Sequence, residues 1–143
     1  MIGILLKEQT KALHDQVEEK LKSHKIMDRS FSLQEYHELL RANYQFLLEF
    51  EDAVFASISS ETKNQIHGDQ RRKLAVIAKD LADFEEVTSF SSKNISIKNE
   101  AEALGILYVM EGSTLGGNII AKNLAKNPTF DGVSFHYFGF YGE

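Results

Sequence analysis

The sequence predicts an all-α protein, a multi-helix bundle that forms a single domain over residues 1–143. Apolar residues recur every three or four positions, which is the spacing of one helix face. No stretch alternates between apolar and polar residues for long enough to build a sheet, and the chain has one proline. Because 43% of its residues are hydrophobic, the chain can bury a core.

Composition excludes several classes of function. The net charge is −5 and no basic stripe is present, so nucleic acid is not expected as a partner. Cysteine is absent, which excludes disulfides, cysteine zinc sites and a cysteine nucleophile, and which suits a cytoplasmic protein. No apolar run reaches the roughly 18 residues of a membrane span, and the N-terminus lacks the features of a signal peptide.

The first half of the chain predicts two helices. Apolar spacing predicts a helix over 4–23, followed by a connection. In "SLQE", Ser32 and Glu35 have the spacing of a capping box, which predicts that a long helix begins there and runs over about 33–57. The acidic stretch "EFEDAVF" in this helix is expected to be a solvated face.

The second half predicts two more helices. A polar loop leads to Asp69, a candidate N-cap for a helix that runs to about residue 86. After the loop "VTSFSSKNIS", Ser96 is the candidate cap of a glycine-bearing helix over about 98–126. The Asn-Pro pair at 127–128 should end it.

The tail is rich in aromatic residues, which need a surface to pack against. They either cover the bundle or contact a further helix. They are Phe130, Phe135, Tyr137, Phe138, Phe140 and Tyr141.

The first helix carries a histidine that could bind haem iron. His14 and Glu18 are four residues apart and share a helix face, with Lys7 and Lys11 on nearly the same side. An axial histidine needs an acceptor for its other ring nitrogen, and haem propionates need cations. The alternative is an ordinary amphipathic helix with a solvated histidine.

The stretch "YVMEGSTLGGN" places glycines inside a predicted helix. Each interior glycine costs about 1 kcal/mol relative to alanine. Gly112 and Gly116 are four residues apart, and Gly117 follows. A membrane dimer is disfavoured because the helix is not apolar enough. A tight helix crossing and a flat ligand against a kinked helix, such as a porphyrin, both remain. Ser113 and Thr114 could then bond freed carbonyls or hold a water.

Together, these two stretches resemble haem oxygenases. "LKEQTKALHDQVE" resembles the family's proximal helix, and "YVMEGSTLGGNIIAKNL" resembles the distal helix of the bacterial, phytochrome-associated branch. The resemblance covers essentially the whole chain. It implies a fold in which haem lies between an N-terminal proximal helix and a kinked, glycine-rich distal helix. Family domains usually continue past the final "YG", so further helices are expected to be missing here.

The resemblance also implies which residues bind haem from the first helix. His14 matches the proximal iron ligand, and Glu18 matches the glutamate that hydrogen-bonds it. Lys7 and Lys11 match basic residues near the propionates.

On the distal side, the resemblance implies a catalytic group of Gly112, Ser113 and Gly116. Gly112 and Gly116 match glycines that let the helix lie close over the ring, and Gly117 extends this part. Ser113 stands where many members have an aspartate that organises the distal water.

The implied reaction cleaves haem to biliverdin, carbon monoxide and ferrous iron. It uses dioxygen and electrons from a ferredoxin or reductase, and a phytochrome apoprotein is a possible receiver of the biliverdin. The alternatives are a haem-binding or haem-sensing protein without turnover and a helical interaction domain. A related fold that acts on thiamin-type pyrimidines is disfavoured, because those relatives commonly use a cysteine nucleophile.

Overall fold

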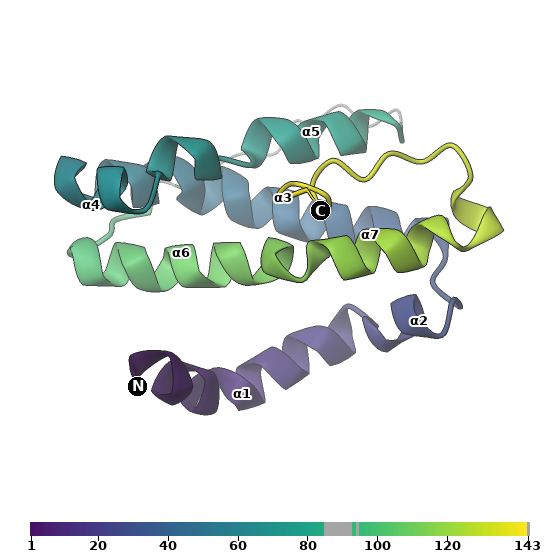
Figure 1. Cartoon of the computed structure of the whole chain (residues 1–143), viewed down its shortest axis with the longest axis horizontal. Coiled ribbons are helices and arrows are strands. Elements are labelled where there is room, and N and C mark those ends of the chain that lie inside the picture. Colours follow the sequence, from purple (N-terminus) through teal and green to yellow (C-terminus); the bar gives the residue numbers. More distant parts are fainter. Residues whose placement is uncertain (85–92, 94, 143) are drawn as a thin grey trace.

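The computed structural model describes residues 1–84, 93 and 95–142, and within them it contains helices and no strand. This confirms the predicted all-α class (Figure 1). The elements are α1 (Ile2–Lys20), α2 (His24–Met27), α3 (Leu33–Ala56), α4 (Ser60–Gln65), the 3₁₀ turn η1 (Gly68–Arg71), α5 (Leu74–Ala82), α6 (Glu100–Leu115), α7 (Gly117–Ala125) and the 3₁₀ turn η2 (Pro128–Phe130).

The core forms around α3. This helix packs against α5 and α6, while α2 packs against α7. Leu40, Leu47 and Val54 recur every seven residues along α3 and are buried. Figure 1 shows α1 beyond α6 and α7, on the side away from α3 and α5. The bundle therefore has its core on one side of α6 and α1 on the other.

The predicted capping box at the start of α3 is confirmed. The Ser32 hydroxyl oxygen accepts a hydrogen bond from the Glu35 amide at 3.1 Å, and Glu35 Oε2 accepts one from the Ser32 amide at 2.9 Å. Lys25 in α2 also donates to Glu35 Oε1 at 2.6 Å. The hydrogen bond from Lys25, followed by that from Ser32, lowers the pKa of Glu35 to about 2. Glu35 thus caps α3 and ties α2 to it.

The prediction for the start of α5 was wrong. Asp69 lies in η1, and the expected polar loop contains α4. At the start of α5, Glu51 Oε2 of α3 accepts hydrogen bonds from the amides of Lys73 at 2.6 Å and Leu74 at 3.1 Å. Glu51 is only 3% exposed, so the expected solvated face is also wrong at this position. Glu51, which is distant in sequence, therefore caps the N-terminus of α5 in place of a local residue.

Other boundaries differ by a few residues. The first helix covers Ile2–Lys20 rather than 4–23, and the expected connection contains the short α2. The end predicted for the third helix and most of the following loop lie outside the described residues. The fourth helix is capped by Asn99, whose side chain accepts from the Glu102 amide at 2.9 Å, and not by Ser96. It ends before residues 127–128, as predicted.

The predicted kink is present at Gly116. Its backbone, with φ −93° and ψ 6°, separates α6 from α7, and the two helices are bent by 30°. A Cβ at Gly116 would meet no described atom within 4 Å, so the interruption itself does not depend on the missing side chain.

The aromatic tail covers the bundle, which was the first of the two expectations. Tyr137 and Phe138 are almost completely buried. Asp80 of α5 accepts hydrogen bonds from the amides of His136 at 3.0 Å and Tyr137 at 2.7 Å. Burial raises the pKa of Asp80, although these two amides oppose the shift. The tail is therefore held by its backbone as well as by its rings.

No helix among the described residues is both long and apolar enough to cross a membrane.

Candidate functional site

Helix α1 has no buried residue although it spans Ile2–Lys20. A helix of this kind normally buries its apolar stripe against a neighbour. Here the stripe is exposed. The stripe consists of Leu6, Leu13 and Val17, and the other exposed apolar residues of this helix are Ile2, Ile4 and Leu5.

One face of α1 is turned toward the bundle. Thr10 is the one partly shielded residue of this helix, and Leu21, directly after it, packs against the core. His14 lies four residues after Thr10 and seven before Leu21, so the three share a face. The predicted ligand histidine therefore shares a face of α1 with Leu21, although its own side chain is 67% exposed.

His14 and Glu18 come together as predicted. Nδ1 of His14 lies 3.7 Å from Oε1 of Glu18, too far for a hydrogen bond but close enough for an ion pair if the histidine is protonated. This geometry leaves Nε2 of His14 for a metal. His14, Asp15 and Glu18 have potential ligand atoms within 4.8 Å of one another, but all three are exposed.

Both predicted lysines are exposed, and the structure gives Lys11 an acidic partner. Lys11 donates to Asp15 Oδ2 at 2.6 Å, and this hydrogen bond raises the pKa of Lys11. A propionate at Lys11 would have to share the ammonium group with Asp15 or displace it.

The glycines of α6 lie on an exposed face. A Cβ placed at Gly105, Gly112 or Gly116 would meet no described atom within 4 Å. These positions are separated by seven and four residues, so they follow one line along the helix. The opposite face is buried at Leu107 and Met110. No described segment crosses closely at these glycines.

Apolar side chains flank the line of glycines. Tyr108 is 46% exposed, Leu115 71% and Ile119 60%. Tyr108 and Leu115 lie four residues before and three residues after Gly112, on the same face. We call Gly105, Tyr108, Val109, Gly112, Leu115, Gly116 and Ile119 the glycine face; every member is exposed.

Gly117 has a different environment from Gly112. A Cβ at Gly117 would lie 2.1 Å from the carbonyl oxygen of Phe138, which is far inside contact distance. Gly117 is buried, whereas Gly112 is exposed. The glycine at 117 therefore makes room for the backbone of the tail, and this packing accounts for it without a ligand.

Two polar residues beside the glycines have partners. The Thr114 hydroxyl donates to the Glu111 carbonyl at 3.3 Å, as expected for a carbonyl near the kink. The Ser113 side chain hydrogen-bonds Tyr137, whose hydroxyl donates to Asn43 Oδ1 at 3.1 Å. Burial raises the pKa of Tyr137, while the hydrogen bond with Ser113 opposes the shift. Ser113 is thus linked to the tail; a role in holding a distal water stays a prediction.

A family model described as "Heme oxygenase" matches residues 2–139, which include α1, the glycine face and most of the tail. The chain belongs to the haem oxygenase family. No curated protein and no solved structure matches it. Family membership implies that the protein binds haem. The glycine face presents exposed apolar side chains, and His14 is exposed as well.

The structure of this family member also contains a charged cluster that the sequence did not predict. The Glu111 carboxylate is bound by Lys73, by Arg71 at 2.8 Å and by the Tyr141 hydroxyl. Lys73 has no exposed surface, and its ammonium group also lies 5.2 Å from the centre of the Phe140 ring. One feature of the sequence could have indicated this cluster. Glu111 follows Met110 on the apolar side of the helix, and a carboxylate that is buried there needs polar partners.

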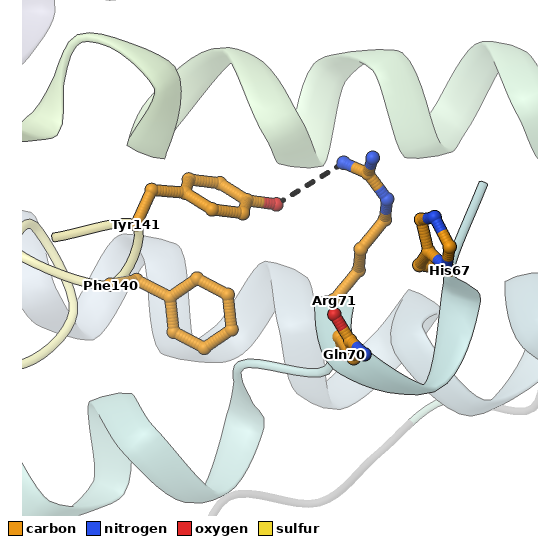
Figure 2. Close-up of a pocket in the computed structure, with 5 residues that line it drawn as sticks. All are labelled: His67, Gln70, Arg71, Phe140 and Tyr141. Carbon is orange, nitrogen blue, oxygen red and sulfur yellow. Dashed lines mark hydrogen bonds between the residues drawn. The ribbon is translucent and has the colours of Figure 1, made fainter.

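A cavity of about 300 Å³ opens beside this cluster. Figure 2 shows His67, Gln70 and Arg71 facing Phe140 and Tyr141 across it, with the Arg71–Tyr141 hydrogen bond of 3.4 Å at its edge. None of the predicted haem residues lines this cavity. In this family member, the surface expected to bind haem and the cavity are therefore separate features.

Proposed function

We propose that this protein is a haem-degrading oxygenase in which haem lies between α1 and the glycine face of α6 and α7. The observation that supports this most is the pairing of two unpartnered apolar surfaces. Helix α1 buries none of its residues, and the glycine face is exposed along its whole length. A flat, largely apolar ligand between them would cover both.

In this proposal, His14 binds the iron through Nε2. Glu18 lies near Nδ1 and would accept a hydrogen bond from the Nδ1–H group, which fixes the tautomer that leaves Nε2 free to coordinate. Lys7 and Lys11 would bind the propionates, with Lys11 exchanging Asp15 for a propionate oxygen.

On the other side, Gly112 and Gly116 would let the helix backbone approach the ring, since a side chain at either position would occupy that space. Leu115 and Ile119 would exclude water from the ring edge. Ser113 and its link to Tyr137 would supply a hydroxyl for a distal water. Gly117 would contact the backbone of the tail and not the haem.

When bound, haem would supply an iron centre that activates dioxygen, with electrons from an external donor, so that the ring is opened to biliverdin, carbon monoxide and ferrous iron. The chain's own task is to hold the ring, orient it and shield it. We propose a ferredoxin or reductase as electron donor, a cytoplasmic reaction and, in view of the resemblance to the phytochrome-associated branch, a phytochrome apoprotein as one possible receiver of the product.

The experiment is a turnover assay. The protein is loaded with hemin, a reductant is added in air, and the spectrum is followed. We expect the haem bands to decay and a biliverdin absorption to appear. A stable haem complex that persists under reductant would contradict the enzymatic proposal and would identify a haem-binding protein without turnover.

A further inference from the structure

Glu111 connects the glycine face to two other parts of the molecule. It directly precedes Gly112 in α6, but its carboxylate points to a different side of the helix, since successive residues are about 100° apart. Three groups bind it there. Arg71 comes from η1, Lys73 from the junction before α5, and Tyr141 from the tail.

Burying these charged groups is not expected to stabilise the fold by much. Lys73 is completely buried and Glu111 is 8% exposed, so both charges lose most of their hydration. Buried ion pairs of this kind often add little stability compared with apolar residues of similar size, but they favour one arrangement of the groups involved. Two cations and a phenol around one carboxylate define where that carboxylate lies.

The pKa shifts of Glu111 and Tyr141 agree with a fixed arrangement of these side chains. Burial acts against ionisation of Glu111, but the hydrogen bonds from Lys73 and Tyr141 outweigh it and lower the pKa of this carboxyl group. Burial and the bond to Glu111 raise the pKa of Tyr141 to about 12, so its hydroxyl remains a donor at neutral pH.

The glycine face needs such an anchor. Gly112 and Gly116 have no side chains to pack, and the helix is interrupted at Gly116. The position of this part of the helix must therefore be fixed by contacts on its other side, which faces the bundle. Two contacts on that side are adjacent in sequence to Gly112: the Glu111 cluster and the hydrogen bond between Ser113 and Tyr137; of the two, only the Glu111 cluster brings charged groups to α6.

We propose that Glu111, held by Arg71, Lys73 and Tyr141, is a positioning residue that sets the distance of the glycine face from the ligand on its other side. The inference rests on the proposed function for the identity of that ligand. The anchoring itself is a property of the ligand-free protein and is tested there as well.

The first test is Tyr141→Phe, which keeps the ring and removes one hydrogen bond to Glu111. Tyr141→Phe also removes the weaker hydrogen bond from Arg71. Ser32→Ala is the control, because it removes a side-chain hydrogen bond at the start of α3, away from the glycine face. In the haem-free proteins we expect amide hydrogen exchange over residues 108–116 to be roughly two- to tenfold faster in Tyr141→Phe and unchanged in Ser32→Ala. Equal exchange in the two variants would overturn the proposal.

The second test uses the hemin complex with azide as a probe of the distal side. We expect Tyr141→Phe and Glu111→Gln to keep the His14-dependent haem band and to change azide affinity roughly two- to tenfold, with Ser32→Ala unchanged. Azide affinities equal to wild type in both variants would overturn the inference. If the wild-type protein forms no His14-dependent band, the proposed function fails, and the exchange experiment still decides the anchoring.

Discussion

Replacing Gly112 by alanine should separate stability from ligand binding. Gly112 lies in the interior of α6, and a Cβ there would meet no described atom within 4 Å. The substitution therefore removes the conformational cost of glycine without a clash. We expect the haem-free protein to gain about 0.5–1 kcal/mol in unfolding free energy, or roughly 2–5 °C in melting temperature.

The same methyl group should weaken hemin binding. If the ring lies against Gly112, the added Cβ occupies contact space, and overpacking of this kind costs about 1–3 kcal/mol, which is roughly five- to 150-fold in affinity. Thermal unfolding of the haem-free protein and a spectroscopic hemin titration measure the two effects. Gly105→Ala is the matched control for the gain in stability, because it lies on the same exposed line of α6, two turns from Gly112.

Two results would refute this reasoning. A Gly112→Ala protein that is stabilised and binds hemin as tightly as wild type would show that haem does not lie on the glycine face. A destabilised protein would show that Gly112 has a packing role that its open surroundings do not explain.

Three further predictions concern the scaffold. Gly117→Ala should destabilise the protein by about 1–3 kcal/mol in urea unfolding, because its Cβ would meet the Phe138 carbonyl; a gain in stability would contradict the tail contact. Glu51→Ala should cost about 1–3 kcal/mol by the same assay, since two amides at the start of α5 lose their acceptor, and a change below about 0.5 kcal/mol would argue against this cap. The pKa of Glu35 is lowered in the folded state, so its contribution to stability is present above pH 4.5 and is lost as the pH falls toward about 2. The unfolding free energy of Glu35→Gln should lack this component, and an acid dependence identical to wild type would count against it.

The parts of the fold that depend on local sequence could be predicted. The capping box at Ser32 and Glu35 needs only residues three apart, and the structure has it as expected. The start of α5 could not be predicted in this way, because its cap is Glu51, which lies more than twenty positions away in another helix. Asp69 was the better local candidate, but it lies in η1 instead. Ser96 was likewise a plausible local cap, but Asn99 caps α6 instead.

The candidate site shows the same division. His14 and Glu18 share a helix turn, and their approach followed from spacing alone. The glycines at 112, 116 and 117 looked alike in the sequence, yet Gly112 and Gly116 are open while Gly117 contacts the tail. That difference depends on how the tail folds back over α7, which is a non-local packing event. The environment of the Glu111 carboxylate was not predicted for a related reason, since its partners come from η1, the junction before α5 and the tail.

The most direct test of the central claim is a hemin titration of the wild-type protein beside His14→Ala, with His24→Ala as a control histidine in α2. The account predicts a Soret band for wild type and His24→Ala that is lost or strongly shifted in His14→Ala. An identical band in all three proteins would show that His14 does not bind the iron, and the placement of haem between α1 and the glycine face would then be wrong.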